Sequence, residues 1–387
     1  MLSHAFYFTS GNKAVLFCQR YRFKPKIMLV KMRIFCLFIF LLSIQSAFAR
    51  EVISYQPPFQ ADKKATKIQY DFLTSVTKPW KICAVYPHLK DSYWLSINYG
   101  MVKQAKKLGI TLKVMEAGGY PNLDKQTWQL QNCREWGADA IILGTVDSQA
   151  YNGKLSQLIG DIPVFLMTNN IDFSDPDIRE HVKAKVGVNW YDMGKAAGEY
   201  LAKRHPKGSG VVKVAWLPGP QLRGGTKPVS RGFRDAIKNS DVEIVTTLWG
   251  DNSKELQRNL IQHLFTTQED FNYIVGGAVA AEVAISELRT HHIHDVKIIS
   301  TYLSHGVYRG LRRNRILFAP TDKMAEQAML SVDQAVRYLE HKPVVLDVAP
   351  SIVDLTPNYL PPKVIAESLS PAEFRPSFYV KDHEVKH

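Results

Sequence analysis

The sequence is poor in cysteine and lacks an apolar run of the roughly 20 residues that a membrane-spanning helix needs. It also lacks Lys/Arg-rich blocks, helix-turn-helix patterns and the zinc spacing of nucleic-acid-binding motifs, so the formal charge of +13 does not indicate a nucleic-acid partner. Residues 1–49 contain no Asp or Glu but hold seven Lys or Arg, which leaves +6 for residues 50–387. The main part of the chain is therefore only mildly basic.

The stretch "KMRIFCLFIFLLSIQSAFAR" is typical of a secretory signal peptide. Lys31 and Arg33 precede an apolar run that is too short to span a membrane, and Ala47 and Ala49 have the A-x-A spacing of a cleavage site. We predict that residues 1–49 are a signal peptide with an upstream extension, cleaved after Ala49. The exported protein would then not span the membrane. A membrane anchor is the alternative.

Export leaves two cysteines, Cys83 and Cys133, in an oxidising compartment. Cys83 lies in the first predicted strand of the alternating pattern and Cys133 in its second helix. With the strand order 2-1-3, that helix crosses strand one, so a disulfide is geometrically allowed. Two buried thiols are an equally good interpretation.

Beyond residue 79, short apolar runs alternate with longer helical patterns, and the alternation starts a second time near residue 185. This pattern predicts an α/β protein with two Rossmann-like lobes, each with a parallel sheet, and a cleft between the lobes. We assign residues 80–186 plus 303–322 to the N-terminal lobe and residues 187–302 plus 323–381 to the C-terminal lobe. Residues 50–79, which contain three prolines and no sustained period, are predicted to form an extended leader on the surface.

Ligands of open α/β sheets bind beyond the carboxyl ends of the strands. The residues at these positions are mostly aromatic, and few carry charge. A group of Trp and Tyr faces suits a methylated cation, because each ring face contributes about 0.5–2 kcal/mol of attraction to positive charge. Hydroxyl and indole groups could serve an acceptor oxygen of the same ligand. The predicted ligand-binding residues are Tyr93, Trp94, Trp190 and Tyr302, with Tyr120 and Asp91 as weaker candidates.

Catalytic and metal motifs are weak. Ser304 adjoins His305, but there is no G-x-S-x-G elbow, so we predict that the protein is not an enzyme and uses no cofactor. "HEVKH" matches the H-E-x-x-H zinc pattern but ends the chain at His387, and "THHIH" is better explained as a polar turn. No metal site is predicted.

Several blocks carry a family resemblance, among them "YPHLKDSYWLSINYGMV", "EAGGYPN", "VGVNWYDMGKAAGEYLAKRHPKGSG", "LRGGTKPVSRGF" and "ESLSPAEFRPSFYV". Over about residues 79–381 the chain resembles the periplasmic binding proteins that sense trimethylamine N-oxide (TMAO) for a membrane sensor histidine kinase. The crossing at residues 186–201 is similar to the wider type I periplasmic binding protein and LacI-like fold.

The resemblance implies a ligand-binding component of a two-component system. Its partners would be TMAO and the periplasmic domain of the kinase, and the aromatic residues above would carry the site. The alternative is a periplasmic receptor for a sugar or a quaternary amine that serves an ABC transporter.

Overall fold

The computed structural model describes residues 50–60, 63–221, 224–267 and 270–381. The predicted signal peptide and the terminal "HEVKH" lie outside the described residues. Arg50–His387 forms one compact unit by itself. None of the helices in the described segments is both long enough and apolar enough to cross a membrane.

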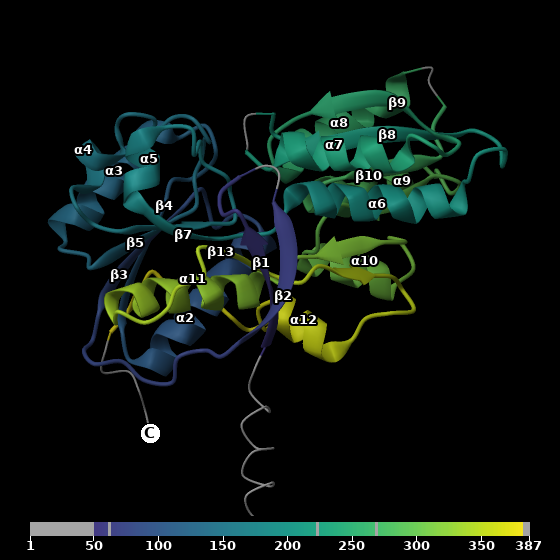
Figure 1. The fold of residues 1–387 in the computed structure, drawn as a ribbon. Helices are drawn as coiled ribbons and strands as arrows, with labels where there is room; N and C mark the ends of the chain where they lie inside the picture. The colour runs from purple at the N-terminus through teal and green to yellow at the C-terminus, as the bar shows by residue number, and fades with distance from the viewer. Residues whose placement is uncertain (1–49, 61–62, 222–223, 268–269, 382–387) are drawn as a thin grey trace, which may run out of the picture. The chain divides into compact units, whose positions relative to one another are not determined.

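The larger sheet has the strand order β15-β4-β3-β5-β6-β7-β13-β1-β2 (Figure 1). Its strands in chain order are β1 Arg50–Gln56, β2 Lys64–Tyr70, β3 Lys81–Tyr86, β4 Thr111–Glu116, β5 Ala140–Leu143, β6 Val164–Met167, β7 Val182–Val186, β13 Asp347–Pro350 and β15 Tyr379–Val380. The strands from β4 to β13 run parallel, whereas β1, β2 and β15 pair antiparallel. The order β4-β3-β5 is the 2-1-3 arrangement under which a disulfide between Cys83 and Cys133 was expected to be possible.

Helices cover both faces of this sheet. They are α2 Ser92–Leu108, α3 Leu123–Glu135, α4 Leu155–Ile159, α5 Pro176–His181 and α11 Met324–Leu339, with α12 Pro362–Ser368 beside α11. Alternate residues of a strand point to opposite faces. Accordingly, Ile82 and Ala84 belong to one apolar core, and Cys83 and Val85 belong to the other, which includes residues of α3.

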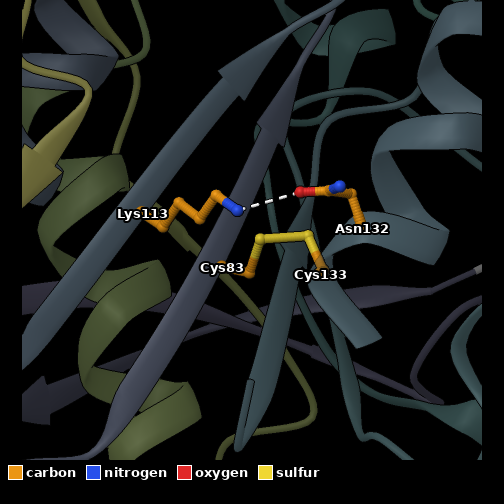
Figure 2. Close-up of a disulfide and its surroundings, with 4 residues drawn as sticks. All are labelled: Cys83, Lys113, Asn132 and Cys133. Carbon is orange, nitrogen blue, oxygen red and sulfur yellow. Dashed lines mark hydrogen bonds between the residues drawn. A yellow bond between two sulfur atoms is a disulfide. The ribbon is translucent and has the colours of Figure 1, made fainter. Parts of the chain in front are cut away.

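Cys83 and Cys133 form a disulfide between β3 and α3 (Figure 2). Beside it, Lys113 Nζ of β4 donates a hydrogen bond to Asn132 Oδ1 at 2.9 Å. Of the two interpretations that the sequence allowed, the structure has the disulfide.

The smaller lobe is built on a parallel sheet of order β11-β10-β8-β9. Its strands are β8 Val212–Gly219, β9 Val242–Trp249, β10 Tyr273–Gly276 and β11 Lys297–Ser300. Its helices are α6 Trp190–Arg204, α7 Thr226–Ile237, α8 Lys254–Thr266, α9 Ala278–Thr290 and α10 His305–Arg312. The short strands β12 Ala319–Thr321 and β14 Val353–Leu355 pair antiparallel, and Ser300 N at the end of β11 donates to Phe318 O just before β12.

The predicted lobe boundaries need correction. Helix α11, which we assigned to the C-terminal lobe with residues 323–381, packs on α2 and on β5, β6 and β7 of the larger sheet (Figure 1). Conversely, α10 and β12 in residues 303–322, which we assigned to the N-terminal lobe, contact α9 and β11. The amphipathic pattern of α11 indicates that it covers a sheet but not which sheet, so the prediction placed the return to the N-terminal lobe before α10 and β12 instead of after them.

The close contact of α11 with α2 depends on Gly100. A Cβ atom at Gly100 would lie 2.1 Å from the carbonyl oxygen of Ala325, so only glycine allows this approach. We therefore define the N-terminal lobe as residues 50–186, 324–350 and 362–380, and the C-terminal lobe as residues 190–321 and 353–355.

The predicted leader is also more ordered than a surface segment. Within residues 50–79, β1 and β2 form an antiparallel hairpin, and β1 pairs with β13. Val52 and Tyr55 are buried, which explains why this polar stretch is held in the sheet. The neighbouring strands β13 and β14 lie in different sheets, because β13 joins the larger sheet and β14 pairs with β12.

Candidate ligand-binding site

Three of the predicted aromatic residues form one buried cluster between the lobes. Tyr93 lies in the first turn of α2, Trp190 begins α6, and Tyr302 follows β11. The ring centroids are 6.4 Å apart for Tyr93 and Trp190, 5.5 Å for Tyr93 and Tyr302, and 6.4 Å for Trp190 and Tyr302. Each ring is at most 4% exposed. We call Tyr93, Trp190 and Tyr302 the ring cluster.

Polar groups fix the orientation of two of these rings. The hydroxyl of Tyr93 donates to Asp322 Oδ2 at 2.5 Å, and Gln327 Nε2 donates to the same oxygen at 3.0 Å. Trp190 Nε1 donates to the carbonyl oxygen of Thr168 at 2.9 Å. Thr168 Oγ1 in turn donates to Gln327 Oε1 at 2.8 Å, so one hydrogen-bonded chain connects Tyr93 to Trp190.

The sequence analysis missed Asp322 and Gln327. Asp322 is fully buried and directly follows β12, a strand end of the kind that we searched. The signal was therefore present in "LFAPTDKM", where an acidic residue follows an apolar run. The strand ends that we searched did not include the end of this strand.

A glycine lies directly against one ring of the cluster. A Cβ atom at Gly225, just before α7, would come within 2.9 Å of several ring atoms of Trp190. The loop backbone of the C-terminal lobe thus packs closely on the indole. A side chain at this position would displace the ring.

Trp94 lies next to the ring cluster but has a different set of neighbours. It stacks on Tyr86 at 5.5 Å and meets Tyr93 edge-to-face at 6.1 Å. A Cβ atom at Gly144 would lie 2.6 Å from its six-membered ring, so Trp94 also packs on the end of β5. Trp94 is thus a core residue of the N-terminal lobe that packs against Tyr93.

The two weaker candidates, Asp91 and Tyr120, lie near the start of α2 and in the loop after β4. Asp91 caps α2, and its carboxylate accepts a hydrogen bond from Trp94 N at 3.0 Å, which helps to fix the start of this helix. The Tyr120 ring contacts His88 at 5.5 Å, and His88 contacts Trp94 at 6.3 Å. Asn169 Nδ2 lies 3.5 Å from the Tyr120 hydroxyl.

A second polar connection joins the lobes near the cluster. Lys185 Nζ donates to Asn170 Oδ1 at 2.6 Å, and Asn170 Nδ2 donates to the carbonyl oxygen of Gly224 at 3.2 Å. Burial, together with the positive charge of Lys63, lowers the pKa of Lys185 to about 8, and Asp347 offsets part of this effect. Keeping this ammonium group charged in its buried position therefore costs free energy.

The residues considered for catalysis serve structural roles. Ser304 Oγ donates to Glu282 Oε1 and caps α10, whereas His305 Nε2 contacts the carbonyl oxygen of Ser370. The two side chains thus contact different partners and do not form a nucleophile and its base. Over the described ranges, no group of three or more His, Cys, Asp or Glu residues could hold a metal ion.

The fold and the ring cluster define the class of protein. Residues 79–355 match the family model of periplasmic binding proteins and the sugar-binding domain of the LacI family. The chain therefore belongs to this family, and the fold is the type I periplasmic binding protein fold that the sequence predicted.

Within the family, the chain is similar to the periplasmic protein TorT of Escherichia coli K12. The two are 43% identical over 303 residues, which cover 78% of this chain and 85% of the relative. A crystal structure of the TorS sensor domain–TorT complex in the presence of TMAO has a TM-score of 0.73 and 56% identity, covering 77% of this chain and 99% of that chain. The resemblance found in the sequence is confirmed.

An ABC transporter solute-binding protein from Bradyrhizobium sp. BTAi1, crystallised with Bis-Tris, is also similar. It is 36% identical, has a TM-score of 0.73, and covers 86% of this chain and 99% of that chain. Both sensory and transport proteins therefore occur among the similar structures.

Proposed function

We propose that the protein is a periplasmic binding protein that binds TMAO at the ring cluster and reports it to the sensor domain of a membrane histidine kinase. The observation that carries this proposal is the contact of three rings contributed by both lobes. The similarity to TorT, crystallised with the TorS sensor domain with and without TMAO, supports the choice of ligand and partner. The protein is proposed to have no catalytic activity.

The chemistry of TMAO fits this cluster. Its methylated, positively charged nitrogen is attracted to the faces of the rings, and each desolvated ring contributes up to about 2 kcal/mol. The buried carboxyl group of Asp322, hydrogen-bonded to Tyr93, lies beside the cluster. The oxide requires a hydrogen-bond donor, and the hydroxyl of a cluster tyrosine can serve as one.

Binding would be coupled to a change between the lobes. The ring centroids lie 5.5–6.4 Å apart, within the range of direct aromatic contact. A ligand that enters between them must move Trp190 and Tyr302 away from Tyr93. Tyr93 belongs to the N-terminal lobe, whereas Trp190 and Tyr302 belong to the C-terminal lobe. The ligand would therefore change the distance between the two lobes.

Calorimetry of the exported protein with TMAO, trimethylamine, betaine and ribose tests the ligand. We expect saturable binding of TMAO and markedly weaker binding of trimethylamine, which lacks the oxide. Tighter binding of betaine or ribose would instead favour a transport receptor. That alternative is raised by the similarity to the Bradyrhizobium solute-binding protein.

The variant Trp190→Ala tests the site. We expect TMAO affinity to fall by at least about 30-fold, the equivalent of 2 kcal/mol. Trp216→Ala is the matched control, because Trp216 is also buried in the C-terminal lobe but stacks on Phe233 at 4.4 Å, away from the cluster. Both variants should lose stability, but only Trp190→Ala should lose TMAO binding; equal affinities would exclude the ring cluster as the site.

Size-exclusion chromatography with the periplasmic domain of the cognate kinase tests the partner. Co-elution that changes with TMAO supports a sensory role. Failure to co-elute at any TMAO concentration would exclude it.

A further inference from the structure

The hydrogen-bonded chain between Tyr93 and Trp190 passes through one side chain, that of Gln327 on α11. Its Nε2 donates to Asp322, which also accepts the hydrogen bond of the Tyr93 hydroxyl. Its Oε1 accepts from Thr168 Oγ1, and the carbonyl oxygen of Thr168 accepts from Trp190 Nε1. Gln327 is fully buried. Because an amide carries both a donor and an acceptor, this one side chain can hold a partner of each ring.

The backbone of Thr168 has an unusual conformation. Its φ is 62°, and Asn169 N donates to the carbonyl oxygen of Met167 at 2.6 Å, which closes a three-residue turn. Turns of this kind are rare and strained, and the branched side chain of threonine makes a positive φ more costly. Such a conformation persists only where the surroundings hold it. Here Thr168 N donates to Val186 O at 2.9 Å, and Thr168 Oγ1 donates to Gln327 Oε1 at 2.8 Å.

Lys323, the residue after Asp322, also has a positive φ, of 53°. Among the described non-glycine residues with positive φ, three follow the C-caps of α9, α10 and α11, where left-handed residues are common: His292, Asn314 and His341. Thr168 and Lys323 instead lie just beyond the ends of β6 and β12. These two left-handed residues therefore lie next to the groups that bond the rings of the cluster.

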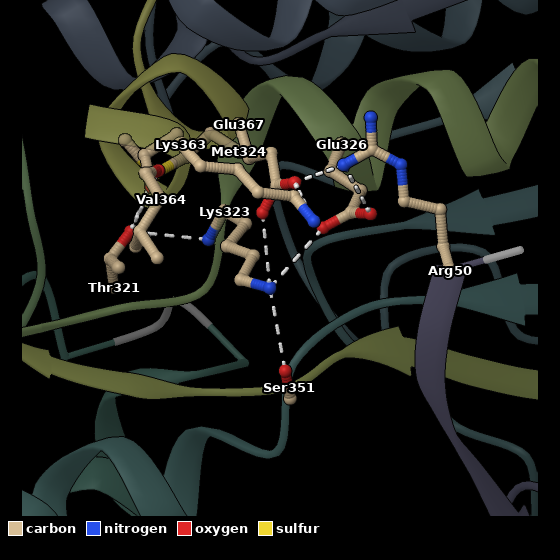
Figure 3. Close-up of polar contacts among 10 residues, drawn as sticks. Arg50, Thr321, Lys323, Met324, Glu326, Ser351, Lys363, Val364 and Glu367 are labelled. Carbon is tan, nitrogen blue, oxygen red and sulfur yellow. Dashed lines mark hydrogen bonds and ion pairs between the residues drawn. The ribbon is translucent and has the colours of Figure 1, made fainter. Parts of the chain in front are cut away.

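A charged network holds Lys323 in place (Figure 3). Its Nζ lies 3.2 Å from Glu367 Oε2, and its backbone N donates to Thr321 Oγ1 at 3.2 Å. The carbonyl oxygen of Lys323 accepts from Gln327 N at 2.9 Å, in the first turn of α11. The conformation of Lys323 therefore fixes both the direction of Asp322 and the position of Gln327.

Both left-handed residues thus bond to Gln327. We propose that Gln327 is a positioning residue of the TMAO site. Through Asp322 it orients the ring of Tyr93, and through Thr168 it orients the indole of the second lobe. Both rings are then oriented before the ligand enters, which lowers the cost of binding. This inference rests on the proposed function.

The variant Gln327→Met tests the role of the amide. It removes both hydrogen bonds of the side chain, so the Asp322 side chain can turn away from Tyr93 and the strained turn at Thr168 loses one of its contacts. We expect calorimetry to show a fall in TMAO affinity of at least about tenfold.

Gln334→Met is the matched control on the same helix. Gln334 is also fully buried, its Nε2 donates to the Tyr70 hydroxyl at 3.2 Å, and its Oε1 accepts from Val345 N at 3.0 Å. Both variants should lose stability, but Gln334→Met should keep the wild-type affinity for TMAO. Equal affinities for TMAO in the two variants would overturn the inference.

A pair of variants at Thr168 tests the next link of the chain. Thr168→Val removes the hydroxyl but keeps the branched shape, whereas Thr168→Ser keeps the hydroxyl that donates to Gln327. Thr168→Ser should therefore bind TMAO at least about fivefold more tightly than Thr168→Val. Equal binding by this pair would contradict a positioning role of the hydroxyl. The pair decides the question even if Gln327→Met does not fold.

The indole N–H resonance of Trp190 reports the positioning without any ligand, because this group donates to the carbonyl oxygen of Thr168. In an NMR spectrum of the isotope-labelled exported protein, the resonance is assigned by its loss in Trp190→Phe. Gln327→Met should shift it, and Gln334→Met should leave it at the wild-type position. An unshifted resonance in Gln327→Met would overturn the inference whether or not TMAO binds. A shifted resonance in a protein that does not bind TMAO would support the positioning of Trp190 and count against the proposed function alone.

Discussion

The two lobes use similar βα units but are assembled differently. The C-terminal lobe takes its parallel sheet from one stretch, β8 to β11, within residues 212–300. The N-terminal lobe combines β3 to β7 with a hairpin that precedes them and with β13, β15 and α11 from the far end of the chain. It also contains the disulfide.

This difference indicates where stability depends on long-range contacts. In the C-terminal lobe, neighbouring units along the chain supply most of the packing. In the N-terminal lobe, distant segments close the sheet and bury polar groups between them. Substitutions at the contacts between these distant segments should therefore lower the free energy of unfolding more than matched substitutions in the C-terminal lobe.

The largest expected effect is loss of the disulfide. The pair Cys83→Ala/Cys133→Ala opens a covalent loop with a sequence separation of 50. The loop-entropy model gives a loss of about 4 kcal/mol in the free energy of unfolding. Denaturant unfolding should show this loss, and a reducing agent should then have no further effect on the variant. An unchanged denaturation midpoint would argue against a stabilising role of this bridge.

The next effect concerns Asp333 of α11. Its buried carboxylate accepts hydrogen bonds from the Tyr70 hydroxyl, from Leu73 N at 2.9 Å, from Gln104 Nε2 at 3.0 Å and from Arg337 Nε at 2.8 Å. It thus joins the hairpin to α11 and α2. Asp333→Asn removes the charge opposite Arg337 and should cost about 3 kcal/mol of unfolding free energy.

The matched change for this second prediction is Asp235→Asn in the C-terminal lobe. Asp235 accepts one exposed hydrogen bond from the Tyr191 hydroxyl at 3.0 Å, so the cost should stay below about 1 kcal/mol. Equal losses of unfolding free energy in the two variants would contradict the expected difference between the lobes.

A smaller effect should appear in the pH dependence of stability. The pKa of Lys185 is about 8 in the folded protein, below the 10.5 of an ordinary lysine, so the unfolded chain binds more protons between these values. The free energy of unfolding of the wild type should therefore rise relative to that of Lys185→Met, by about 2 kcal/mol between pH 8 and pH 10.

Lys183→Met is the control for the pH experiment, because Lys183 lies on the same strand but is only half-buried. It removes a lysine from the same strand but leaves the buried ammonium group of Lys185 in place. Parallel curves for Lys185→Met and the wild type would show that Lys185 keeps an ordinary pKa.

The smallest expected effect lies where the lobes meet. Tyr93→Phe removes the hydroxyl that donates to Asp322 but keeps the ring. Loss of one hydrogen bond of about 1 kcal/mol should weaken TMAO roughly fivefold in calorimetry. Tyr191→Phe, which removes an exposed hydroxyl on α6, should leave the affinity unchanged. A full loss of binding in Tyr93→Phe would mean that the hydroxyl contacts the ligand directly.

Much of this architecture could be predicted because it depends on local sequence patterns. Helices at 92–108 and 254–266 and the strand order around β3 follow from apolar periodicity and the right-handed crossover rule. The strand-end rule likewise selected Tyr93, Trp190 and Tyr302, which the structure brings together. The rule could not distinguish these three residues from Tyr120 and Asp91. A strand end can present a ligand-facing ring, a ring with other neighbours such as Tyr120, or a helix-capping residue such as Asp91.

The sequence by itself determined the alternation of strands and helices, the aromatic character of the strand ends and the isolation of two cysteines in the main part of the chain. These features depend on residues that are close in sequence or on simple periodicity. Only the tertiary structure decided which sheet α11 covers, that the leader becomes two strands, and that Asp322 lies at Tyr93. Each of these involves contacts between segments far apart in sequence, namely α11 with the larger sheet, β1 with β13, and Tyr93 with Asp322 at a separation of 229, and no local pattern specifies such a pairing.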